Sequence, residues 1–88
     1  MDERYERLRA KMLEQVAEHE RGDLDDAGLR LAVEGFLSSL DHTHDDVRQV
    51  LFEADIALEY AQYGHPLDGS DPRAPLRRMR RNLREALR

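Results

Sequence analysis

The stretch from Thr43 to Gly64, THDDVRQVLFEADIALEYAQYG, decides the fold of this 88-residue chain. Its small and aliphatic residues recur at steps of three and four, the spacing of one face of an α-helix. This first row comprises Val47, Val50, Leu51, Ala54, Ala57, Leu58 and Ala61. A second row beside it comprises Phe52, Ile56, Tyr60 and Tyr63. Two rows make an apolar surface too wide for one neighbour, so we expect a central helix that is contacted on more than one side.

Residues 2–21 are predicted to form the first helix, and Gly22 is a plausible residue to end it. Its narrow apolar stripe comprises Tyr5, Leu8, Met12, Leu13 and Val16. A stripe of this width predicts that the first helix covers one side of the central helix. His19 is expected to stand alone at the surface.

The second helix is expected to start after Asp25 and to run to about Leu40. Asp25 is a favoured N-cap, and Leu24 and Leu29 have the spacing of a hydrophobic staple. Gly28 and Gly35 lie on one side of this helix, where they either permit close approach of another helix or are merely tolerated. We favour the second interpretation.

The remaining helix boundaries follow from capping residues and prolines. Thr43 is a good N-cap for the central helix, and Gly64 followed by Pro66 ends it. Asp71-Pro72 is typical of a helix start. The last helix carries an apolar stripe of Leu76, Met79, Leu83 and Leu87. Because no segment alternates like a strand, the sequence predicts an all-α, four-helix antiparallel bundle and a single small domain over residues 1–88.

Charge is distributed unevenly along the chain. The formal net charge is −5, with 38% of residues charged. Residues 1–71 carry 18 acidic and 7 basic side chains, whereas residues 72–88 carry Glu85 and seven arginines. The chain is therefore an acidic body with a net charge of −11 and a basic amphipathic C-terminal helix with a net charge of +6. Such a division is typical of an interaction surface.

Composition narrows the classes of function. Cysteine is absent, which excludes disulfides and thiolate chemistry and suits a cytoplasmic location. No signal segment is evident, and no apolar run approaches the ~18 residues that span a bilayer.

The candidate chemical groups favour no catalytic reaction. Residues 41–46, DHTHDD, include His42 and His44 and could bind a metal, but helix capping explains Thr43, Asp45 and Asp46. His19 and His65 lack a nucleophilic partner. We predict neither an enzyme nor a cofactor.

Two charged surfaces remain as candidate binding sites. Acidic residues on or near the second and third helices would present a phosphate-like field to a basic protein. The alternative is a nucleic-acid site on the last helix, formed by Arg77, Arg78, Arg80, Arg81 and Arg84. These arginines could equally pair with the acidic body of the same molecule.

From Leu13 onwards the chain resembles the self-protective colicin-like immunity proteins, the family related to the colicin D immunity protein. The resemblance lies in a helix ending in ERGDL (20–24), Phe36 in the next helix, VLFEADIALEY (50–60), a Pro/Asp loop (65–72) and a final leucine-bearing helix. It implies a helical inhibitor that masks the basic cleft of a toxin, often a nuclease. The resemblance assigns the masking of this basic cleft to Asp55 and Glu59, assisted by Asp45 and Asp46. The Arg-rich last helix departs from the family pattern.

These observations predict a non-enzymatic domain that binds and neutralises or regulates a protein partner by covering a basic surface with an acidic face. One alternative is a small dimeric regulator that binds nucleic acid through the arginines of the last helix. Another is a structural helical module of a larger complex, for which an apolar face left exposed after folding would be the sign. Such a face would equally indicate a homodimer.

Overall fold

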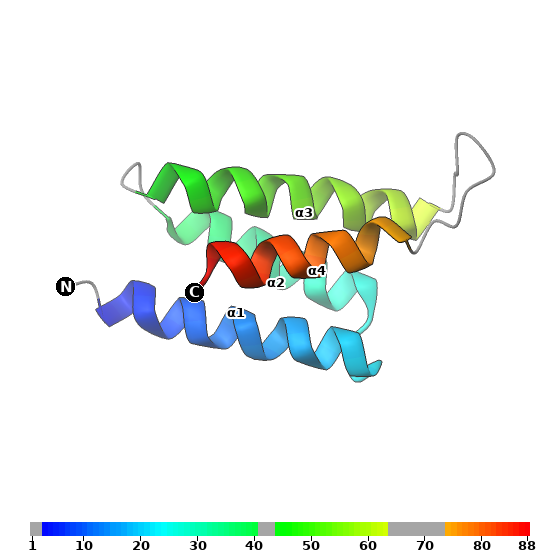
Figure 1. Ribbon diagram of the computed structural model, residues 1–88, viewed down its shortest axis with the longest axis horizontal. Coiled ribbons are helices and arrows are strands. Elements are labelled where there is room, and N and C mark those ends of the chain that lie inside the picture. Colours follow the sequence, from blue (N-terminus) through cyan, green and yellow to red (C-terminus); the bar gives the residue numbers. More distant parts are fainter. Residues whose placement is uncertain (1–2, 41–43, 64–73) are drawn as a thin grey trace.

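The computed structural model describes residues 3–40, 44–63 and 74–88. These residues form the helices α1 (Glu3–Arg21), α2 (Asp26–Ser39), α3 (Asp45–Tyr63) and α4 (Ala74–Ala86), with no strand among them. Successive helices run in opposite directions (Figure 1), so the prediction of an all-α antiparallel bundle is confirmed. No helix in these ranges has the length and apolar character needed to cross a membrane. The expected caps at Thr43, Gly64 and Asp71 lie outside the described residues.

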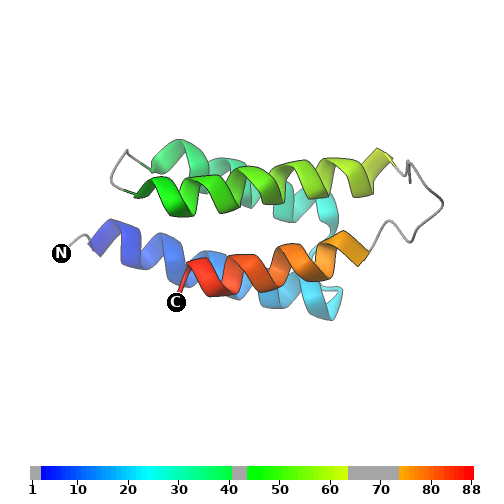
Figure 2. The same ribbon diagram turned by 45° about the horizontal axis from the view of Figure 1, so that its top comes forward.

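The four helices form a closed ring in which each contacts two neighbours. α2 packs on α1 and α3, and α4 packs on α3 and α1. Figure 2 shows α1 beside α4, with α2 and α3 above them. α1 and α3 therefore lie diagonally opposite, and the expectation that the first helix covers one side of α3 is wrong. α3 has two helical neighbours, but it occupies one corner of the ring and not its centre.

Each helix buries a single apolar stripe. α1 contributes Met12 and Val16, α2 contributes Leu29, Val33 and Phe36, and α3 contributes Leu51, Ala54 and Leu58. The C-terminal segment contributes Leu76, Met79, Leu83 and Leu87. Val47, Val50, Ala57 and Ala61 pack against this core. The first row of α3 thus meets both neighbours. The expectation that the second row is also covered is wrong, because its four members are exposed.

Two helix ends have the geometry that their residues predict. Gly22 adopts a positive φ of 88°, and the amide of Asp23 donates to the carbonyl of Glu18 over 2.9 Å. The Gly22 amide donates to the carbonyl of His19, which completes a Schellman motif. Asp25 caps α2, since its Oδ1 accepts a 2.7 Å hydrogen bond from the amide of Gly28.

The two glycines of α2 differ in their surroundings. A Cβ on Gly28 would lie 2.6 Å from Cδ1 of Leu24, whereas a Cβ on Gly35 would meet nothing within 4 Å. The space beside Gly28 is filled by the Leu24 side chain, which folds over the start of α2. Gly28 therefore does not serve the close approach of another helix. Gly35 is tolerated, as expected.

His19 is not a surface residue. Only 5% of it is exposed, and its Nε2 lies 2.7 Å from Oδ1 of Asp26 in α2. Its Nδ1 lies 3.1 Å from Nη1 of Arg80 in α4. A guanidinium only donates, so Nδ1 accepts, and Nε2 carries the proton that it donates to Asp26. His19 therefore links three helices.

Replacing Gly22 with alanine is expected to lower the free energy of unfolding by about 1 kcal/mol, because a Cβ disfavours the positive φ. The matched change Gly35→Ala should raise it by up to about 1 kcal/mol, since alanine has the higher helix propensity and the space is open. Urea unfolding followed by circular dichroism measures both. Equal effects of the two changes would contradict this account.

The change His19→Phe keeps an aromatic ring but removes both hydrogen bonds, so a loss of about 1–3 kcal/mol is expected. The exposed change Glu14→Gln serves as the control and should alter stability by less than about 0.5 kcal/mol. The ¹⁵N chemical shifts of the imidazole in the parent protein should identify the Nε2–H tautomer. An Nδ1–H tautomer, or an unchanged stability of His19→Phe, would refute the bridge.

Candidate functional site

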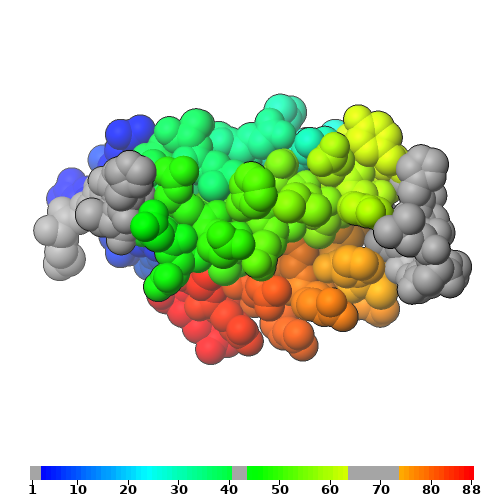
Figure 3. Space-filling view, turned by 90° about the horizontal axis from the view of Figure 1, so that it is seen from above, coloured from blue at the N-terminus to red at the C-terminus, as the bar shows by residue number. Residues whose placement is uncertain are grey.

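The outer face of α3 carries a row of large apolar side chains that remain exposed in the described part of the structure. Phe52, Ile56, Tyr60 and Tyr63 are 56%, 43%, 50% and 65% exposed. Their spacing of four, four and three places them on one side of the helix over about 16 Å. Figure 3 looks onto this helix, which lies between α2 and α4 on that side of the molecule. We call these four residues the aromatic row.

An exposed apolar cluster carries more information than scattered exposed side chains, because contiguous apolar patches mark interaction sites. Among the described residues the other large exposed apolar side chain is Leu31 of α2, which is 70% exposed. Tyrosine and phenylalanine are also enriched at protein interfaces. The aromatic row is therefore the strongest candidate site on this molecule.

The four carboxylates expected to bind a partner do not form one surface. Asp45 lines a hollow of about 250 Å³ with Phe52, at the start of the aromatic row. Asp46 shares its side of the helix with Val50 and Glu53, which line the groove toward α4. Both aspartates are exposed in the first turn of α3, where a negative charge complements the helix dipole.

Asp55 and Glu59 come together at Arg30 of α2. Nε of Arg30 lies 3.0 Å from Oδ1 of Asp55, and its Nη2 lies 3.7 Å from Oε2 of Glu59. The same guanidinium is 3.3 Å from Glu34 and donates to Oε1 of Gln62 over 3.2 Å. We call these five residues the Arg30 cluster. It carries three carboxylates against one guanidinium, so it stays negative although Asp55 is paired.

The hydrogen bond to Asp55 is the main cause that raises the pKa of Arg30, and nearby carboxylate charges add to it against the effect of partial burial. Asp55 itself is half-buried between α2 and α3. It therefore serves the packing of these two helices. Glu59 is exposed and is better placed to meet a partner beside the aromatic row.

The five arginines expected to bind nucleic acid are divided by the fold. Arg80 contacts His19, and Arg84 pairs with Glu20 of α1. This hydrogen bond from Arg84 is the largest cause of the lowered pKa of Glu20. Arg77, Arg78 and Arg81 are exposed and have no ion pair within the described part of the chain.

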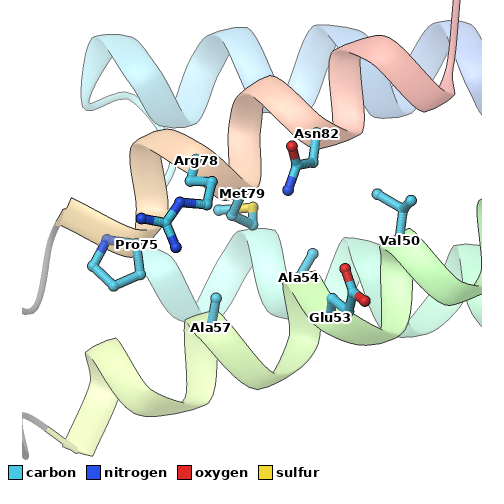
Figure 4. A pocket seen from close by; sticks show the side chains of 8 residues that line it. All are labelled: Val50, Glu53, Ala54, Ala57, Pro75, Arg78, Met79 and Asn82. Atoms are coloured by element: carbon cyan, nitrogen blue, oxygen red, sulfur yellow. The ribbon is translucent and has the colours of Figure 1, made fainter.

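A groove between α3 and α4 is too small for a typical ligand. Val50, Ala54 and Ala57 line it from α3, and Pro75 and Met79 line it from α4 (Figure 4). Its polar lining residues are Glu53, Arg78 and Asn82. The volume of about 180 Å³ lies below the ~300 Å³ at which ligand pockets begin.

The histidine-containing segment 41–46 offers little support for a metal site. His44 packs against Tyr5, with ring centroids 4.0 Å apart and ring planes tilted by 40°. His42 and His65 lie outside the described residues. In the ranges that the structure covers, no three histidine or carboxylate groups are placed to hold a metal ion.

Sequence reasoning missed the Arg30 cluster and the bridging role of His19. The spacing of Arg30 and Glu34 already allowed an ion pair within the helix. Nothing in the sequence, however, indicated that Asp55 and Glu59 would face this arginine, since that depends on how α2 and α3 pack.

No family model matches this chain, and no curated protein or solved structure matches it either. The resemblance to the colicin-like immunity proteins therefore stays a prediction that rests on the quoted residues.

Replacing Arg30 with glutamine is expected to destabilise the bundle, because Asp55, Glu34 and Glu59 then repel one another. Adding Asp55→Asn should recover part of the loss, and added salt should do the same by screening. Arg81→Gln is the matched control, since this exposed arginine has no partner among the described residues. Urea unfolding of the four proteins at two salt concentrations tests this, and an Arg30→Gln variant as stable as the control would contradict it.

Proposed function

We propose that this domain binds a protein partner through the outer face of α3 and covers a positively charged surface of that partner. The observation that supports this most is the aromatic row, four large apolar side chains exposed side by side on one helix. In a typical interface a few buried aromatic or aliphatic residues provide most of the binding energy, inside a polar rim.

The carboxylates around the row supply such a rim. Asp45 stands at the Phe52 end, and Glu59 and Glu34 border the row on the side of α2. α3 carries five carboxylates and one arginine, a formal net charge of −4. This field would speed encounter with a basic partner, and burial of the aromatic row would slow its release.

The mode of action would be that of an immunity protein or antitoxin, which inactivates a toxin or nuclease by steric and electrostatic occlusion. It needs no reacting group on this chain. The placement of Asp55 changes the expected division of roles: we assign masking to Asp45 and Glu59 with the aromatic row, and helix packing to Asp55.

Binding through the arginines of α4 is the second candidate. It is favoured by one observation, the three exposed arginines Arg77, Arg78 and Arg81. If nucleic acid binds there, replacing the three with glutamine should abolish a low-salt gel shift. A shift that persists in that variant, or no shift in the parent protein, would reject this candidate.

The change Ile56→Asp should lower affinity for the partner by about 30-fold or more, the effect of losing a hot spot of about 2 kcal/mol. The bundle should still fold, because Ile56 lies outside the buried core, and circular dichroism checks this. The partner is identified as a protein that both the parent and Glu14→Gln retain from a lysate. Interferometry with that purified protein then gives the affinities.

The rim is tested separately by the double change Asp45→Asn with Glu59→Gln. It should slow association several-fold and weaken the salt dependence of the association rate, with little effect on dissociation. Binding that neither Ile56→Asp nor the rim change alters would place the interface elsewhere and refute the proposal.

A further inference from the structure

Two neighbouring helices of this bundle carry opposite net charge. α3 holds five carboxylates and one arginine, for a net charge of −4, and α4 holds five arginines and Glu85, for a net charge of +4. The two helices pack side by side and run in opposite directions (Figures 1 and 2). One side of the molecule is thus divided lengthwise into an acidic and a basic half.

Neither half is neutralised within the described residues. On α3, Asp45, Asp46, Glu53 and Glu59 are exposed, and only Glu59 lies within 4 Å of a guanidinium. On α4, the exposed Arg77, Arg78 and Arg81 have no ion pair with another described residue. Glu53 and Arg78 stand on opposite walls of the groove between the two helices, as Figure 4 shows.

We propose that a second copy of this chain covers the side formed by α3 and α4. A two-fold axis parallel to the helices places α3 of one copy against α4 of the other, and the reverse. Exposed carboxylates of α3 then face exposed arginines of α4 twice. An axis perpendicular to the helices would place α3 against α3 and oppose equal negative charges, so electrostatics selects the first arrangement.

The side chains suit this pairing. Arginines stack their guanidinium planes on aromatic faces and lay their apolar stems along apolar surface. Tyr60 and Ile56 would receive Arg77 or Arg81 of the other copy. Glu53 of each copy would meet Arg78 of the other, because both flank the shared groove. One interface thus accounts for the exposure of Tyr60 and Ile56 and for the unpaired arginines.

The interface is small. α4 has 13 residues, so it is about 20 Å long, and two helices side by side are about 20 Å wide. Such a face is smaller than the ~800 Å² per partner of a standard interface. The dimer is therefore expected to be weak and sensitive to salt.

The dimer uses part of the face that we propose for the partner, so one molecule cannot form both complexes at once. Self-association would therefore keep the partner-binding face covered. The dimer does not depend on the proposed function, and its test uses the purified full chain without any partner.

Sedimentation velocity over a concentration series should show a monomer–dimer equilibrium at low salt, weakened about tenfold or more at ~0.5 M salt. The changes Arg78→Glu and Glu53→Arg should each abolish the dimer, because each opposes like charges at both copies of the contact. An equimolar mixture of these two variants should dimerise again, since both contacts are restored in the mixed dimer. Glu14→Arg on α1 is the control and should dimerise as the parent protein does.

A parent protein that stays monomeric at about 1 mM and low salt would overturn this inference. So would a dimer that tolerates Arg78→Glu, a mixture that fails to restore association, or a ladder of larger species, which indicates an open heterologous contact. Binding of the partner separates the two proposals, because Arg78→Glu should abolish the dimer and preserve partner binding.

Discussion

The geometry of a four-membered ring allows each helix to bury only one apolar stripe. A helix at a corner faces two neighbours and the shared core with about half of its circumference, and the other half faces outward. Val50, Ala54 and Ala57 line the side of α3 toward α4. The first row of α3 fills the inner half completely. The second row, although equally apolar, has no inner position left and must point outward.

Charged and polar contacts specify which helices become neighbours. Arg30 joins α2 to α3, His19 joins α1 to α2 and α4, and Arg84 joins α4 to Glu20 of α1. Exposed ion pairs contribute little stability individually. The buried His19 differs, because its two hydrogen bonds have defined directions and reach two other helices. These contacts therefore define one arrangement among several that would bury the same leucines.

The sequence predicted whatever depends on a single helix. The helix type, the capping by Asp25, the stop at Gly22 and the buried stripes follow from local spacing and from the conformational preferences of single residues. It did not predict relations between helices. The link between His19 and Arg80 joins residues 61 positions apart, and the one between Arg30 and Asp55 joins residues 25 apart. Periodicity assigns a residue to a face of its own helix, but it does not say which neighbour, or whether any neighbour, covers that face.

The candidate site follows from this limit. Because two apolar rows on one helix resemble a doubly buried core helix, the pattern of α3 alone suggested a central position. The core of the described residues is closed without the second row: the stripes of all four helices are buried while Phe52, Ile56, Tyr60 and Tyr63 remain in contact with solvent. The aromatic row therefore adds little to the stability of the isolated domain, and its apolar surface is left available for association. In the proposed complexes, carboxylates beside the row and arginines on the next helix would restrict which surfaces can cover it, so charge would select the occupant and apolar contact would hold it.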